Sequence, residues 1–489
     1  MMEKNGRTKP ASRINTARLK MILSLLPKVP LLLRVVLLHV LRISEPSKYL
    51  DLQSDVIVAI LRAMLGGSKP KPISRTQAMT LKDPGVQGRI WISTVAAQVP
   101  PETGIRDALL EAVAALDESG ADVASLRVPD IVPIEAEWTG YRAAARKDAK
   151  PPTISEEEKY REMMKECKSS VTVLYFHGGA YYLCDPATHR PLTKKLAKLT
   201  RGRVYSVRYR LAPQHPFPAA LLDALMSYFT LLYPPPGSIH EAVAPGDIVF
   251  GGDSAGGNLV FALLQTLLQL RRQNRKIAWF GEEREVPLPA AVTGNSPWCD
   301  LVQSMPSWAT NEKWDYLPNS KLLDATTPPD DIWPAKPPRK HLYVDDAFMM
   351  HPLASIHLSS TWEESPPVYI CCGWECLADE DKYLVSKLVK DGVTVVFEEY
   401  EAMPHVFASI LTQIPESRRN LQGWTRFISA ACENPRDIQS KFTLIKAKSL
   451  EESEVDVKNL SPFSDKEVFE MACKGAGKES PTPRVAAKL

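Results

Sequence analysis

The stretch Phe250-Gly251-Gly252-Asp253-Ser254-Ala255-Gly256-Gly257-Asn258 decides how this chain is interpreted. A short apolar run (248–250) precedes it and a longer one (259–270) follows, which predicts a strand, a sharp turn and a helix. Ser254 is the centre of G-x-S-x-G, where the flanking glycines leave room for a serine on a tight turn. Such a turn presents the hydroxyl as a nucleophile beside the first N–H groups of the helix. Ordinary glycine-rich turns also produce this pentapeptide, so its partners must decide.

Composition places the chain among globular proteins with ample core material. Its 489 residues are 44% hydrophobic and 24% charged, which argues against wholesale disorder and against a polytopic membrane protein. A net charge of +3 is too small to indicate a nucleic-acid surface, so we expect no nucleic-acid partner. The eight cysteines show no disulfide framework and no zinc spacing, which favours a reducing, intracellular compartment.

Short apolar segments alternate with helical ones through the second half of the chain. This alternation predicts a mostly parallel sheet with helices on both faces. The predicted strands are 171–176, 203–209, 247–250, 290–293, 368–372 and 393–400, with helices at 187–199 and 219–232 among them; an earlier strand is expected at 89–97 and a surface helix at 105–116.

Two glycines follow the predicted strand 171–176 directly, in His177-Gly178-Gly179-Ala180. Ligands bind at the carboxyl ends of parallel strands, and glycines there allow backbone N–H groups to point into the crevice. Alone, the pair is equally consistent with a plain turn. Together with the serine turn, it indicates an oxyanion hole of the kind found in lipases and esterases.

These motifs resemble the hormone-sensitive-lipase branch of the α/β-hydrolase superfamily, which includes arylacetamide deacetylases and fungal esterases. The resemblance covers about half of the chain. It implies an eight-stranded α/β-hydrolase sheet, a helical cap, no cofactor, and an oxyanion hole formed by the N–H groups of Gly178, Gly179 and Ala255. The matching positions are 177–180, 209–213, 215–220, Asp223, 252–258, 296–298 and Asp300.

The base and the acid of a catalytic triad must follow the serine in this fold. His405 comes after the predicted strand 393–400 and before a helix, which is the correct place for the general base. The acid is Glu375 or Asp379. Glu375 stands where the family more often has Asp and is favoured, whereas Asp379 is interpreted as a residue at the start of the next helix.

Other conspicuous residues receive structural interpretations. Residues 209–213 and Asp223 are expected to fix a turn and brace the sheet, and Asp253 is expected to point away from Ser254. For three aromatic residues near the crevice, lining of the substrate pocket and plain packing both remain open: Tyr181, Tyr182 and Trp298.

The chain ends and one insertion lie outside the predicted catalytic domain, 169–432. Residues 1–67 are expected to form two or three helices that lie on a membrane or pack as a cap; residues 68–168 are a pre-core and cap region. Charges and prolines argue against a spanning helix and against a signal peptide. The insertion 300–357 is expected to complete the cap, and 433–489 to be a mostly disordered tail with one short helix at 464–473.

The sequence therefore predicts a serine hydrolase that cleaves short-chain acyl or acetyl esters of a hydrophobic alcohol. Two alternatives remain: a non-catalytic small-molecule receptor on the same fold, and a membrane-associated lipid or sterol ester deacetylase. The expected partners are a small-molecule ester and, through the N-terminus, a membrane surface such as the endoplasmic reticulum or a lipid droplet. The oligomeric state is left open.

Overall fold

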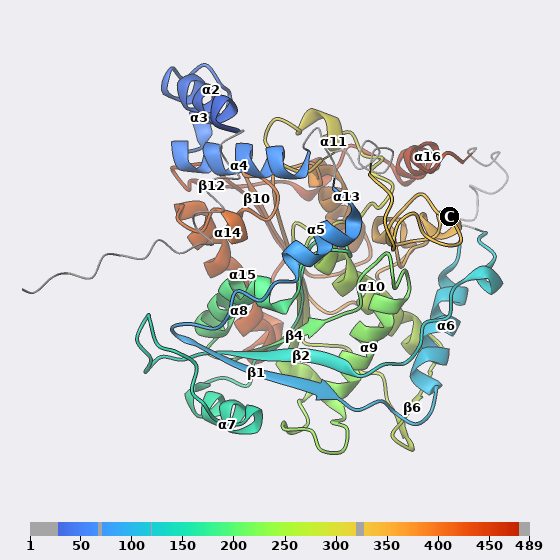
Figure 1. Cartoon of the computed structure of the whole chain (residues 1–489). Coiled ribbons are helices and arrows are strands. Elements are labelled where there is room, and N and C mark those ends of the chain that lie inside the picture. Colours follow the sequence, from blue (N-terminus) through green and yellow to red (C-terminus); the bar gives the residue numbers. More distant parts are fainter. Residues whose placement is uncertain (1–27, 67–70, 119, 319–326, 479–489) are drawn as a thin grey trace, which may run out of the picture.

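A ten-stranded, mostly parallel sheet runs through the molecule (Figure 1). The computed structural model describes residues 28–66, 71–118, 120–318 and 327–478. Strands from β4 to β11 pair in parallel, while β1, β2 and β12 pair antiparallel at the two edges. In sheet order the strands are β1 (Ile90–Ala97), β2 (Ile134–Tyr141), β4 (Arg203–Arg208), β3 (Thr172–Phe176), β5 (Ile248–Asp253), β8 (Ala291–Asn295), β9 (Val368–Gly373), β10 (Val395–Tyr400), β11 (Lys441–Ile445) and β12 (Glu452–Glu454).

The expectation of eight strands and of a disordered tail was wrong. The tail adds β11 and β12 beyond the first eight strands, whereas α16 (Asp465–Ala476) forms where the short helix 464–473 was predicted. Despite the polar composition, one side of β11 and one side of α16 are buried, through Phe442, Ile445 and Val468. Residues 479–489 lie outside the described part of the chain. In the region 68–168, predicted to be pre-core and cap, β1 forms at the strand predicted at 89–97, and β1 and β2 extend the sheet itself.

Apolar residues on the central strands alternate between two hydrophobic layers. Leu174 and Phe176 of β3 belong to one core cluster, and Val173 and Tyr175 belong to the other. Helices cover both faces, which is why the central strands are apolar throughout. The first layer contains α6 (Gly104–Leu116), α9 (Ala219–Leu232), α10 (Ala255–Arg272) and α13 (Ala378–Lys390); the second contains α8 (Pro186–Thr200), α14 (Phe407–Ile410) and α15 (Pro415–Glu433).

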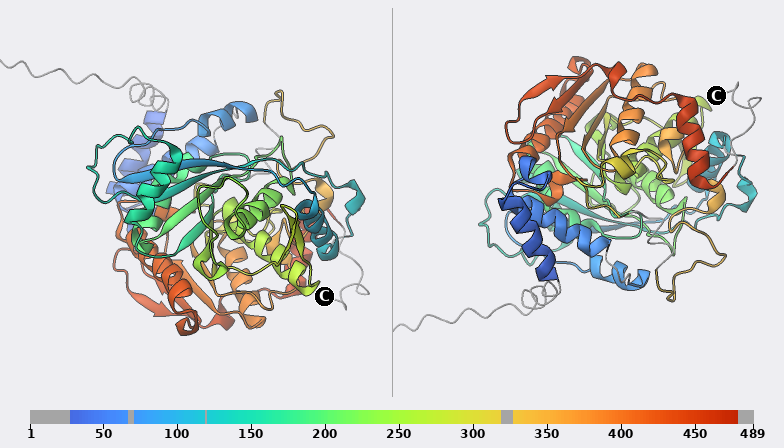
Figure 2. Two further views of the ribbon diagram at one scale, coloured as in Figure 1. Left: turned by 90° about the horizontal axis from the view of Figure 1, so that it is seen from below. Right: turned by 90° about the horizontal axis from the view of Figure 1, so that it is seen from above.

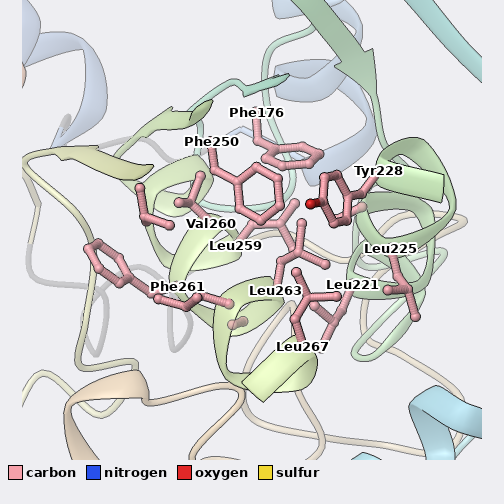
Figure 3. Packing of buried hydrophobic residues seen from close by; sticks show 14 of the residues in the cluster. Phe176, Leu221, Leu225, Tyr228, Phe250, Leu259, Val260, Phe261, Leu263 and Leu267 are labelled. Atoms are coloured by element: carbon pink, nitrogen blue, oxygen red, sulfur yellow. The ribbon is translucent and has the colours of Figure 1, made fainter. Parts of the chain in front are cut away.

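Figure 3 shows how α10 is anchored below the sheet. Leu259, Leu263 and Leu267 recur at every fourth position, which places them on one face of the helix. They pack near Phe176 and Phe250 from the two strands above, and all five are fully buried. This packing fixes the helix whose N-terminus follows Ser254.

The N-terminal helices lie at the surface of the molecule (Figures 1 and 2), where Leu50 and Val58 pack into the second hydrophobic cluster. Two or three helices were expected in 1–67, and the described part contains α2 (Val29–Val40), α3 (Pro46–Tyr49) and α4 (Leu52–Leu65); residues 1–27 are outside it. In the described ranges, no helix is both long enough and apolar enough to span a bilayer. The remaining elements are α5 (Ile73–Thr80), α7 (Glu156–Glu166), α11 (Ser307–Thr310) and the hairpin β6 (Ile277–Trp279) and β7 (Glu282–Arg284).

Candidate active site

Ser254 occupies a strained turn between β5 and α10. Its backbone has φ of 53° and ψ of −122°, a conformation that a non-glycine residue adopts only when its surroundings enforce it. The Ser254 N–H donates to the carbonyl of Asn295 at 3.1 Å, and Trp298 N donates to the Ser254 carbonyl at 3.0 Å. A side chain at Gly256 would overlap the carbonyl of Phe176, which explains the glycine two residues after the serine.

Glu375 and His405 form a buried pair above the carboxyl ends of β9 and β10. The carboxylate Oε1 lies 3.2 Å from His405 Nδ1, and both side chains are nearly inaccessible to solvent. Glu375 Oε2 accepts hydrogen bonds from the Ser296 hydroxyl at 2.8 Å and from Gly373 N at 3.4 Å. The acid therefore has a fixed orientation, with one oxygen directed to the imidazole.

The carboxylates around His405 make its imidazole a stronger base than an ordinary histidine. Burial alone would lower the pKa of His405, but the charge of Glu375 and the hydrogen bond to it outweigh burial, and Asp315 and Asp253 act in the same direction. The net result is a raised pKa for His405. An imidazole poised in this way suits proton transfer near neutral pH.

All three predicted triad residues follow parallel strands of the same sheet, in which β8 lies between β5 and β9 and β10 is next to β9. Ser254 follows β5, Glu375 follows β9 and His405 follows β10, and these strands end at the same edge. The carboxylate next to Ser254, Asp253, lies close enough for its charge to act on His405. The topology therefore gathers a nucleophile, a base and an acid in the place where parallel sheets bind ligands.

The loop after β3 was expected to supply N–H donors for the oxyanion hole, but the N–H of Gly178 already has an acceptor. Its N–H donates to Asp253 Oδ1 at 3.2 Å, so the expectation that Gly178 forms the oxyanion hole was wrong. Positive φ angles at Gly179 (114°) and Ala180 (52°) turn the following amides in a different direction. Across the described residues, the N–H groups of Gly179, Ala180 and Ala255 have no protein acceptor.

Asp253 holds this loop, as expected of a residue that points away from the nucleophile. It accepts hydrogen bonds from the Tyr175 hydroxyl and from Gly178 N, and it lies 3.4 Å from His189 Nε2. Burial would raise the pKa of Asp253, but His189 and these hydrogen bonds outweigh burial and lower it. Burial lowers the pKa of His177 to about 3, so this imidazole is neutral.

The alternative acid, Asp379, and the turn that contains Arg210 also have defined hydrogen-bond partners. Asp379 Oδ2 accepts from Ser307 N at 2.8 Å at the start of α13, whereas Glu375 is the carboxylate bonded to His405. Arg210 and Asp223 form a salt bridge of 2.7 Å that also includes the Arg210 N–H, in agreement with the structural role expected for them.

Two aromatic residues whose role was open are packed in the core. Tyr181 is fully buried, stacks on Tyr343 at 3.6 Å and donates from its hydroxyl to Asn258. Trp298 is 7% exposed and donates from its indole to the Asp300 carbonyl at 3.0 Å. Tyr182 is only partly buried and stays a candidate for contact with substrate.

Sequence reasoning missed three residues that support the site. His189 pairs with Asp253, and Ser296 orients Glu375. Asp315 accepts hydrogen bonds from the backbone N–H groups of Cys376, next to the acid, and of His405. Ser296 could have been found from its matching motif, 296–298, but nothing in the local sequence marks Asp315. In the described ranges, no group of three His, Cys, Asp or Glu side chains is arranged to hold a metal ion.

Comparison with known proteins agrees with this geometry. Residues 173–409 match the family described as having the α/β-hydrolase fold. An acetyl-hydrolase from Streptomyces hygroscopicus is 32% identical over 262 residues, which cover 53% of this chain and 76% of that protein. An esterase from Acinetobacter venetianus is 28% identical over 270 residues, covering 55% of this chain and 78% of that protein.

A solved structure has the same fold. The crystal structure of EstE5 soaked with p-nitrophenyl butyrate superposes with a TM-score of 0.53 at 22% identity. The match covers 76% of this chain and 96% of that chain.

Proposed function

Because the chain belongs to the α/β-hydrolase family and its relatives include ester hydrolases, we propose that it cleaves carboxylic esters through an acyl-enzyme intermediate on Ser254. The observation that carries this proposal is the strained backbone of Ser254 at the same edge of the sheet as the buried Glu375–His405 pair. A receptor on the same fold would have no need of all three groups. The receptor alternative is therefore the weaker one.

In the proposed mechanism, His405 takes the proton of the Ser254 hydroxyl while the oxygen attacks the ester carbonyl. Glu375 accepts the hydrogen bond from His405 Nδ1 and stabilises the imidazolium that forms. His405 then gives the proton to the leaving alcohol. A water molecule, activated by the same imidazole, releases the acid and restores Ser254.

The negative charge that develops on the carbonyl oxygen needs N–H donors. We assign this role to Gly179, Ala180 and Ala255, whose N–H groups have no acceptor among the described residues. The N-terminus of α10 adds a favourable dipole. Loss of one such donor typically lowers turnover by about 10² to 10³.

We further propose that the ester is a short-chain acyl, and in particular an acetyl, ester of a hydrophobic alcohol. The similarity to an acetyl-hydrolase supports the acyl part of this proposal. We also propose that the chain belongs to the hormone-sensitive-lipase branch, with the N-terminal helices and the insertion 300–357 as the cap. Contacts between these parts support the cap: Arg62 donates to the carbonyl of Asp315, and Lys313 pairs with Glu45.

The experiment is hydrolysis of p-nitrophenyl esters from acetyl to long acyl chains by the wild type and by Ser254→Ala. We expect short chains to be preferred and the variant to lose activity by on the order of 10⁴-fold or more. Asp379→Asn is the matched control and should stay close to the wild type, because Asp379 bonds Ser307. Activity that persists in Ser254→Ala, or a folded wild type that hydrolyses none of the esters, would contradict the proposal.

A second proposal concerns where the enzyme works: α2 rests on an anionic membrane surface inside the cell. None of its residues is buried, and its apolar side chains face solvent, with Leu33 64%, Leu37 58% and Val40 65% exposed. The first 48 residues carry ten Lys and Arg against two acids. Exposed apolar side chains beside excess positive charge are typical of helices that lie in the interface of anionic lipids.

Flotation with lipid vesicles tests this second proposal. The protein should float with vesicles of phosphatidylcholine and phosphatidylserine, and less with phosphatidylcholine alone. The double variant Leu33→Asp and Leu37→Asp should lose binding, whereas Leu199→Asp, at a side chain of α8 that is 43% exposed, should retain it. Equal flotation of all variants would overturn the proposal, as would a dimer in light scattering that dissociates in the double variant.

A further inference from the structure

A short segment of the insertion touches both loops that carry the acid and the base. Asp315 is 1% exposed; its Oδ2 accepts from Cys376 N at 2.8 Å and its Oδ1 from His405 N at 3.2 Å. Four residues earlier, Asn311 Nδ2 donates to the carbonyl of Glu375 at 3.0 Å. One buried carboxylate therefore fastens the acid loop to the base loop.

The N-terminal helices hold this segment from the outside. Arg62 of α4 donates from Nε to the Asp315 carbonyl at 2.9 Å. Its Nη2 donates to the carbonyls of Glu312 at 3.0 Å and Lys313 at 3.1 Å. A planar guanidinium with several donors suits this task, because it can bind neighbouring carbonyls from one side. The shape of the segment thus depends on a residue more than 200 positions earlier.

An aromatic cluster makes the same connection through packing. Tyr49 of α3 lies edge-on to Trp314 at 5.2 Å between ring centroids and 5.9 Å from Trp374. The two tryptophan rings are 5.6 Å apart. Trp374 directly precedes Glu375, so the cluster reaches the acid loop from the N-terminal helices.

We propose that Asp315 is a positioning residue for the triad, and that Arg62 makes the N-terminal helices part of the active-site framework. This inference rests on the proposed esterase function. Three N–H groups share the two carboxylate oxygens, because Tyr316 N also donates to Oδ1 at 2.7 Å. An asparagine has only one carbonyl oxygen, so it cannot satisfy donors on both sides, and one loop is released.

Asp315 also contributes a charge near the base. The groups that act on His405 are Glu375, Asp315 and Asp253, and each of these carboxylates raises the pKa of the imidazole against the effect of burial. Removal of the Asp315 charge therefore has a signature that loosened packing alone would not produce: the pKa of His405 falls.

The test uses the full chain and p-nitrophenyl acetate. Asp315→Asn should lower kcat by about 10- to 100-fold, since a misplacement near 1 Å can cost roughly 10². KM should stay near the wild-type value, and the acidic limb of the kcat/KM profile should move to lower pH. Asp330→Asn is the matched control, because Asp330 is also in the insertion and also accepts backbone N–H groups, from Ser74 of α5 and from Ile332 and Trp333.

Two substitutions at the exposed Arg62 keep the test independent of the buried site. Arg62→Ala should lower kcat, and Arg62→Lys should restore part of it, because an ammonium group can still donate to the same carbonyls. If Asp315→Asn does not fold, this pair decides the question.

Three results would overturn the inference. They are full kcat in folded Asp315→Asn, equal losses in the Asp315 and Asp330 variants with no shift of the pH profile, and full kcat in Arg62→Ala. Failure of the esterase function itself would differ from these, because the wild type would then show no hydrolysis that depends on Ser254.

Discussion

Replacing Glu375 with Gln should disable the base without disturbing the fold. In the native site, Oε2 accepts two hydrogen bonds, from the Ser296 hydroxyl and from Gly373 N, while Oε1 faces His405 Nδ1. A glutamine can satisfy those two donors only if its carbonyl oxygen takes the place of Oε2. Its NH₂ group then points at Nδ1 of the imidazole and donates to it.

That arrangement forces the wrong tautomer, with the imidazole proton on Nε2, where His405 can no longer accept a proton from Ser254. A corresponding acid-to-amide change in a serine protease lowers turnover by about 10⁴, which is roughly 5.5 kcal/mol of transition-state stabilisation. We expect a loss of the same order for Glu375→Gln in kcat/KM on p-nitrophenyl acetate.

The assay should include a pH profile and a thermal denaturation curve for each variant. The melting temperature of Glu375→Gln should remain near that of the wild type, since the side chain keeps its shape and two hydrogen bonds. Asp379→Asn serves as the control that removes a nearby carboxylate without touching His405. A loss below about tenfold in a folded Glu375→Gln, which is roughly 1.4 kcal/mol, would refute the tautomer argument.

Three further outcomes are expected. In the wild type, kcat/KM should fall as the pH decreases through a value above the ordinary histidine pKa of about 6.5, because only neutral His405 accepts a proton and its pKa is raised. If kcat/KM instead fell only below about pH 6.5, the carboxylates would not be raising the pKa of His405. Gly179→Ala should lower kcat strongly on the same ester, because the new Cβ would overlap the Leu183 carbonyl and the φ of 114° disfavours alanine; unchanged turnover would contradict the placement of this loop. Arg190→Ala should destabilise the fold by about 3 to 5 kcal/mol in urea denaturation, because it leaves the carboxylate of Glu137, 2% exposed, without its 2.5 Å partner; a change below about 1 kcal/mol would show that the pair is dispensable.

The central part of the site could be predicted because its signals are local. The glycines around Ser254 indicate a tight turn, and the apolar run before Gly178 indicates a strand that ends where the next turn begins. The direction of a backbone N–H is different, since it depends on φ angles that no residue type specifies. The prediction therefore placed Gly178 among the oxyanion donors, although its N–H is taken by Asp253.

Missed elements have a common physical cause: their polar residues acquire partners only in the folded chain. The strand β2 contains Glu137, which disrupts the apolar pattern but is neutralised by Arg190. Likewise, β11 is polar on one side, and only the burial of Phe442 identifies the other side as core. Asp315 is the extreme case, because its partners lie 61 and 90 residues away.

The short outer strand β12 has a consequence for handling this protein. It has only three residues, Glu452–Glu454, and all three are exposed, so the strand closes the sheet with a short edge that offers another copy little to pair with. A version of the chain that ended at residue 433 would lose β11 as well and would uncover the side of β10 that β11 pairs with. Such an edge invites intermolecular pairing, so shortened versions that stop at the end of α15 should aggregate, whereas those that extend to residue 478 should stay monodisperse.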